Sequence, residues 1–252
     1  MRDASRIAYA QARVQARFSL RPHEAFWREL EAGRDLPHLV EFIRGSGLRD
    51  TSGVVGASLD AHAMEARLRN RWLASCEEVA AWYPAAWSPS MRWLGWLPWI
   101  APLGWLAHTR DAAPWMDDDA VLRGLAPAAA EESPASLPGG ALGPLEAAFS
   151  SAGDLAAAWH AHWRDTWPET DRGTRRGLDR LAGAVEGLLP GTTDLRLDPL
   201  VDAIEDTTTR LFRRHAGTPV AGLALIVLAA LDYLRLRGAL AVARSFGQAP
   251  AS

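Results

Sequence analysis

The sequence contains no lysine, a single cysteine and almost no excess of charge, and the last two features each exclude a class of protein. All 27 basic residues of the 252-residue chain are arginines, set against 30 acidic residues for a formal net charge of −3. This balance provides no basic surface for a nucleic-acid backbone. The lone Cys76 excludes an internal disulfide and a multi-cysteine zinc site, and it suits a reducing compartment.

The sequence also lacks a long apolar run. The longest covers only residues 220–231 and is closed by Asp232, whereas a membrane-spanning helix needs about 20 apolar residues. We therefore interpret this run as a buried core helix. The N-terminal residues have no continuous apolar stretch of the kind found in a signal peptide, so we expect a cytoplasmic protein.

What is present is helical periodicity. Apolar residues recur at three- and four-residue steps, and no stretch keeps the two-residue alternation of a strand. We predict an all-α, multi-helix bundle with single helices over 58–83 and 145–167 and a final helix opened by Pro219. Residues 126–144 are rich in Ala, Pro and Gly without periodicity, which predicts a linker or mobile loop between helical lobes at 1–125 and 145–252.

A segment rich in tryptophan and proline, residues 84–116, interrupts this pattern. Seven of the twelve tryptophans lie between Trp82 and Trp115. The prolines forbid one long helix, so we predict short helical turns joined by kinks. Three interpretations are open: a core-filling segment, a membrane-interface element, or a protein-docking surface.

The residues that could carry chemistry form no motif. His160 and His162 make a His-x-His pair, but side chains two apart on a helix point about 200° away from each other, which disfavours a shared metal ion. We expect one of these rings to pack among tryptophans and the other to lie in solvent. The run Asp117–Asp119 is typical of an acidic first helical turn. Cys76 occupies an apolar helix position, which indicates an inert buried thiol. We predict no catalytic residue, metal or cofactor, and the sequence identifies no small-molecule substrate.

Four segments occur in an order known from one protein family: YAQARVQAR (9–17), LPHLVEFIRGSGL (36–48), DAHAMEARLRNRW (60–72) and LIVLAALDYLRLRGALAVA (225–243). They resemble helices of the central-stalk connector subunit of V/A-type rotary ATPases, a family with members in prokaryotes and eukaryotes. In the late helix of that family an apolar run meets an acidic residue and then arginines. Asp232, Arg235 and Arg237 are the matching positions.

The resemblance implies a funnel-shaped, all-helical and non-catalytic subunit that lies between the rotor ring and the central stalk of a proton- or sodium-translocating ATPase. Its partners would be protein subunits of a membrane complex, with peripheral contact at the inner face of the cell membrane. We expect Asp232, Arg235 and Arg237 to dock a partner, together with a second set on the Trp-rich segment: Trp93, Trp96, Trp99 and Trp105. The alternatives are an unrelated helical adaptor or membrane-peripheral protein that uses the Trp-rich segment, and a helical enzyme that uses His160 or His162.

Overall fold

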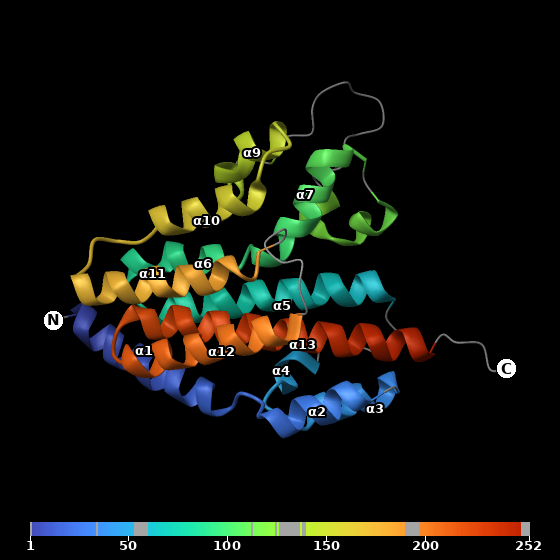
Figure 1. Cartoon of the computed structure of the whole chain (residues 1–252), viewed down its shortest axis with the longest axis horizontal. Coiled ribbons are helices and arrows are strands. Elements are labelled where there is room, and N and C mark those ends of the chain that lie inside the picture. The colour runs from blue at the N-terminus through green and yellow to red at the C-terminus, as the bar shows by residue number, and fades with distance from the viewer. Residues whose placement is uncertain are drawn as a thin grey trace.

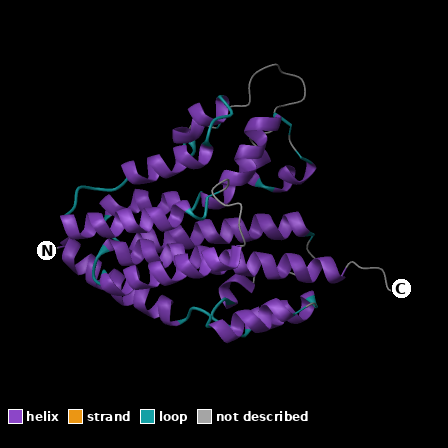
Figure 2. Cartoon of the chain, viewed as in Figure 1, coloured by secondary structure: helices purple, strands orange, loops and turns teal. Residues whose placement is uncertain are grey.

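The computed structural model describes residues 2–33, 35–52, 60–111, 113–123, 125, 137, 140–189 and 197–247. All regular structure within these ranges is helical (Figure 2), which confirms the predicted all-α bundle. The α-helices are α1 (Arg2–Ser19), α2 (Glu24–Ala32), α3 (Leu36–Arg44), α4 (Arg49–Ser52), α5 (Ala61–Trp82), α6 (Ser88–Leu94), α7 (Ile100–Thr109), α8 (Ala120–Arg123), α9 (Glu146–Ser150), α10 (Leu155–Asp165), α11 (Arg172–Glu186), α12 (Leu197–Arg214) and α13 (Pro219–Gly247).

Helix α13 forms the centre of the bundle, with α5 beside it and α1, α2, α3, α6, α11 and α12 packed around it (Figure 1). Every residue of the apolar run 220–231 is buried except Ala229. By length and composition residues 219–245 could cross a membrane, but 78% of the most apolar stretch is buried inside the protein. The prediction of a buried core helix is therefore confirmed.

The ends of the helices follow from local capping. Asp60 accepts a hydrogen bond from the backbone N–H of Ala63 and opens α5, which ends just before Tyr83 and Pro84 as the sequence predicts. Asp35 caps α3 in the same way. Between α12 and α13, Gly217 has a φ of +78°, a left-handed conformation that glycine adopts without a Cβ clash.

Residues 84–116 form short helices separated by bends, as predicted. The 3₁₀ helices η1 (Ala85–Trp87), η2 (Leu97–Trp99) and η3 (Pro114–Asp118) alternate with α6 and α7. Proline stands in the first turn of α6, η2 and η3, where a missing N–H leaves no hydrogen bond unmade. The chain therefore changes direction repeatedly and directs several indoles inward.

The single helix predicted over 145–167 is wrong. After the 3₁₀ helix η4 (Gly143–Leu145), α9 and α10 are separate helices. Ala152 between them adopts a left-handed φ of +51°, and the Gly153 N–H bonds back to the Ala148 carbonyl, which ends α9. Asp154 then caps α10 by accepting from the Ala157 N–H.

Most of the predicted linker 126–144 lies outside the described residues, and Leu137 and Leu142 within it are buried. One large apolar cluster contains residues from both predicted lobes, from α1, α5, α6 and α7 on one side and α10 to α13 on the other. A smaller cluster joins α2, α3 and the start of α5 to the last turns of α13. The boundaries of the two lobes stay a prediction, and residues of both predicted lobes contribute to the large apolar cluster.

Candidate functional site

A cavity of about 360 Å³ lies beside α13, between the end of α1, the α3–α4 connection and the middle of α5. We call it the central cavity. One face of α5 lines it with Leu68, Trp72, Cys76 and Val79. Opposite stand residues of α13 that also recur at helical spacing and so share one face: Leu225, Ala229, Asp232 and Leu236. Ala229 is partly exposed within an otherwise buried run because it borders the central cavity.

The outer wall of the central cavity consists of two turns in close contact. The turn after α1 contributes Leu20 and Pro22, and the connection before α4 contributes Gly47 and Leu48. A Cβ atom on Gly47 would lie 1.9 Å from the Leu20 carbonyl oxygen, so only glycine permits this approach. Leu20 is 60% exposed, which places the mouth of the cavity at the protein surface.

A buried ion pair closes one end of the cavity. Arg21 donates two hydrogen bonds to Asp232, of 2.8 and 2.7 Å, and a third of 3.0 Å to Glu205. The side chains of Arg21 and Asp232 are only 12% and 7% exposed. Burial raises the pKa of Asp232, and the neighbouring Arg21 guanidinium opposes this rise. Bonds to charged groups in a fork–fork geometry hold this end of the cavity rigid.

Three further arginines stand around the cavity: Arg17, Arg49 and Arg71. Arg17 donates a 2.7 Å hydrogen bond to Glu78. The Arg71 guanidinium comes no nearer than 3.6 Å to its acidic neighbour Asp50, whose side chain is 67% exposed. That distance exceeds a normal N–H···O bond, so the Arg71 side chain is the least firmly held of the charged groups with a described contact here.

The only thiol of the chain also borders this space. Cys76 is 1% exposed, and burial raises the pKa of its thiol well above the ordinary value. The thiolate is the nucleophilic form of cysteine, so a raised pKa makes this side chain a poor nucleophile. Its position on the cavity wall agrees with the inert, apolar role predicted from the sequence.

The three polar residues predicted to dock a partner point to different places within the chain. Asp232 binds Arg21, whereas Arg235 bonds to Asp202 at 3.0 Å and Glu205 at 3.1 Å. Arg237 bonds to Glu65 at 2.8 Å. Asp232 and Arg235 are three residues apart on one helix face and could pair, but Arg21, 211 residues away in sequence, occupies the Asp232 carboxylate. Their role in binding a partner stays a prediction.

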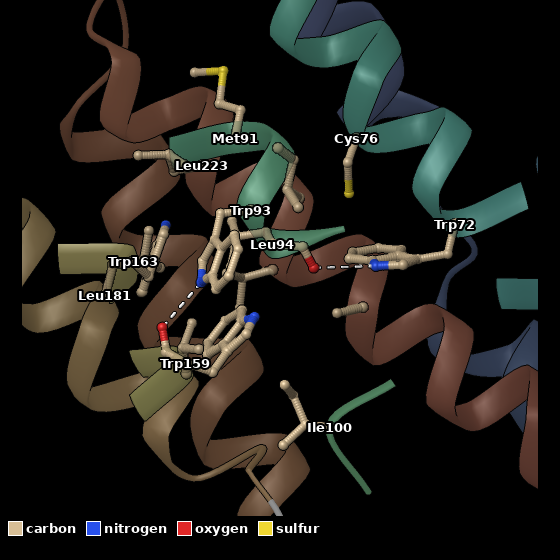
Figure 3. Close-up of a cluster of buried hydrophobic side chains, with 14 of the residues drawn as sticks. Trp72, Cys76, Met91, Trp93, Leu94, Ile100, Trp159, Trp163, Leu181 and Leu223 are labelled. Atoms are coloured by element: carbon tan, nitrogen blue, oxygen red, sulfur yellow. Dashed lines mark hydrogen bonds between the residues drawn. The ribbon is translucent and has the colours of Figure 1, made fainter. Parts of the chain in front are cut away.

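The tryptophans predicted as a contact surface are divided between core and surface. Trp93 and Trp99 are buried, Trp96 is half-buried, and Trp105 is 42% exposed. Figure 3 shows Trp93 beside Trp159, with the Trp93 indole N–H donating to the Trp159 carbonyl at 3.0 Å. The core-filling interpretation therefore holds for Trp93 and Trp99, and of these four only Trp105 is exposed.

His160 and His162 turn to opposite neighbours, as their helical spacing predicts. The His160 ring lies 3.2 Å from the Ala182 carbonyl on α11, whereas the His162 ring packs edge-on against Trp93 on α6. Both rings are partly buried, so neither is the solvated histidine that we expected. Within the described ranges, no group of three His, Cys, Asp or Glu side chains could hold a metal ion.

The acidic run 117–119 differs from the predicted first helical turn. Asp117 and Asp118 belong to η3 and are exposed, whereas Asp119 is buried and caps α8 through the backbone N–H groups of Val121 and Leu122. The Asp119 carboxylate also accepts a 2.9 Å bond from Arg69. This second buried ion pair was not predicted, because Arg69 lies within a helix pattern that shows nothing unusual.

No protein-family model, curated protein or solved structure matches the chain. The resemblance to the rotary ATPase connector subunit therefore rests on the four sequence segments alone and stays a prediction. A second hollow beside Trp167 and Arg175 is more open, so the central cavity is the stronger candidate to enclose another molecule. Its arginines Arg21 and Arg71 had no distinguishing signal in the sequence.

Proposed function

We propose that the protein acts by binding, and that it encloses a small molecule with an apolar body in the central cavity. The observation that carries this proposal is a hollow of about 360 Å³ beside α13, the helix at the centre of the bundle. Protein interiors are otherwise packed without voids much larger than a water molecule. Ligand sites typically have volumes of about 300–1,000 Å³, apolar walls and a few fixed polar groups.

The walls of the cavity favour binding over catalysis. They present the side chains Leu68, Trp72, Cys76, Leu225 and Leu236, and the charged groups of the lining with described contacts are held in ion pairs. The Asp232 carboxylate at that end is already bonded twice by Arg21. A general base must reach the proton that it removes, and Asp232 has no such freedom.

The test uses prodan, a neutral dye whose emission shifts to the blue in an apolar site, and the variant Ala229→Phe. The added ring would occupy the cavity, so we expect one prodan molecule to bind the wild-type protein and none to bind this variant. Ala241→Phe is the matched control, because Ala241 is exposed on the same helix. Equal binding by wild type and Ala229→Phe, or no binding by wild type, would contradict the proposal.

The connector function implied by the family resemblance is a separate proposal. Asp232, Arg235 and Arg237 are bonded within the chain, so a partner would have to compete with these contacts or use other surface, for which the exposed Trp105 is the candidate among the predicted residues. Co-purification of rotor-ring or central-stalk subunits with the natively expressed protein tests this proposal. Recovery of neither kind of subunit would exclude it.

A further inference from the structure

The charges around the central cavity identify the kind of ligand that it would take. We infer that the ligand is a single-chain amphiphile of about ten carbons whose head group is a carboxylate bound by Arg71. This inference rests on the proposed binding function. It follows from three independent features: the excess of guanidinium groups at the rim, the position of Asp50, and the size of the hollow.

Guanidinium groups outnumber carboxylates in the lining. Arg17, Arg21, Arg49 and Arg71 border the cavity, against Asp50 and Asp232. A ligand with an apolar chain and a negative head would complement both the walls and this rim. A cationic head would have to compete with arginine for acidic groups that are already bonded.

Among the cavity arginines whose side-chain contacts are described, Arg71 is the one best able to accept a new partner. Arg21 is already bonded to Asp232 and Glu205, and Arg17 is bonded to Glu78. Arg71 is 24% exposed, and the acidic contact that the structure shows for it is Asp50 at 3.6 Å. Guanidinium and carboxylate match in a planar, two-bond geometry that an ion pair at this distance does not use.

Asp50 marks the place of the ligand head. Its own carboxylate lies on the Arg71 guanidinium at the rim, so this position already suits a carboxylate. Because Asp50 is largely exposed, turning it into solvent would cost little, as exposed ion pairs contribute only about 0–1 kcal/mol. A ligand carboxylate would replace Asp50 while its chain enters the apolar hollow behind it.

The volume limits the length of the chain. Ligand sites have volumes of about 300–1,000 Å³, and a hollow of about 360 Å³ lies at the lower end of this range, which favours one short chain over a long or branched one. Decanoate, with ten carbons and two oxygens, is therefore the probe. Its neutral and cationic counterparts are 1-decanol and decyltrimethylammonium.

The experiment is calorimetric titration of these three compounds, each below its aggregation concentration, into the full-length protein. We expect decanoate to bind once per chain and at least tenfold more tightly than 1-decanol, with the cation weakest. Arg71→Gln should reduce decanoate affinity to the level of the alcohol and leave alcohol binding unchanged. Asp50→Ala should strengthen decanoate binding severalfold, because it removes the internal competitor. Arg67→Gln is the control, since Arg67 is exposed on α5 and does not line the cavity.

Two kinds of failure can be distinguished. Equal binding of decanoate and 1-decanol, or an Arg71→Gln variant with undiminished decanoate affinity, would overturn the carboxylate assignment while leaving the cavity a binding site. Absence of binding by all three compounds and by prodan would overturn the proposed function itself. Melting temperatures of the variants, measured without ligand, show whether each is folded.

Discussion

The two sides of α13 are both covered by tryptophan and other apolar residues, but one side is filled and the other contains the central cavity. Towards α6 and α10, the indoles of Trp93, Trp159 and Trp163 stack in a filled core (Figure 3), and those of Trp93 and Trp163 donate hydrogen bonds to main-chain carbonyls. Towards α1 and α4, Trp72 and Cys76 line a hollow closed by arginines. An apolar helix face therefore does not guarantee a filled core, because the segments that cover the face determine whether the space beside it is filled.

The covering elements explain this difference. The filled side is covered by short helices whose frequent bends direct an indole into each gap. The hollow side is covered by two turns that meet backbone to backbone at Gly47 and Leu20, so no side chain from this contact fills the space beneath. Four predictions test whether the two sides differ as described.

The largest effect is expected from truncation on the filled side. Trp163 is fully buried and its indole N–H donates to the Ser90 carbonyl at 3.0 Å. Trp163→Ala should lower the free energy of unfolding by about 3–5 kcal/mol, through lost packing and a cavity. Trp105→Ala, at a 42% exposed site, should change it by no more than about 0.5 kcal/mol. Urea denaturation measures both, and losses of equal size would contradict the assignment of Trp163 to the core.

The next largest effect is expected at the two buried ion pairs, Arg69–Asp119 and Arg21–Asp232, which should contribute differently to the free energy of unfolding. Asp119 accepts from Arg69 and also caps α8, so Asp119→Asn should cost about 3 kcal/mol by leaving a buried guanidinium undercompensated. Asp232→Asn should cost less, about 1.5–3 kcal/mol, because Arg21 keeps a 3.0 Å bond to Glu205, whereas Arg69 keeps only a longer bond of 3.3 Å to Glu65. The same denaturation assay compares them. A greater loss for Asp232→Asn would mean that the end of the cavity depends on this pair more than its geometry indicates.

A smaller effect, and one of opposite sign on the two sides, is expected from enlarging alanines of α13. Ala224 is fully buried in the filled core, so Ala224→Leu should destabilise the protein by about 1–3 kcal/mol. Ala229 borders the hollow, so Ala229→Leu should be neutral or stabilise by up to about 1 kcal/mol. Chemical denaturation again provides the measurement. Destabilisation of equal size by both changes would show that no usable space lies beside Ala229.

Much of the fold could be predicted because its signals are local. Asp60 and Pro84 mark the ends of α5, the apolar run marks the buried α13, and prolines mark the bends of 84–116. The break between α9 and α10 was missed although Asp154 carries an N-cap signal, since the apolar period continues across it. Periodicity alone does not show one left-handed residue such as Ala152.

The cavity could not be predicted in the same way, because empty space has no sequence pattern. Its walls come from four segments, and the Arg21–Asp232 pair joins residues 211 positions apart. The charge at position 232 was noticed because it ends an apolar run, but its partner depends on how α1 crosses α13. Arg71 resembles any other arginine on a helix until the contacts around it are known.

The smallest effect on stability, and a measurable effect on reactivity, is expected at the Cys76 thiol. Cys76, the only thiol, borders the hollow, and burial raises its pKa, so little thiolate is present at pH 8. Alkylation by iodoacetamide should therefore be slow at pH 8 and should still accelerate as the pH rises above 9, since more of the thiol ionises.

In the double variant Cys76→Ala/Ala182→Cys the thiol would lie in the filled core, where Ala182 is fully buried. Reagent would reach that site only through larger opening of the protein, so its reaction should be at least about tenfold slower than that of Cys76. Decanoate should protect Cys76 and leave the double variant unaffected. Equal rates for the two proteins, measured by intact mass at several pH values, would mean that the hollow gives no access to its wall and that the two sides of α13 are equally closed.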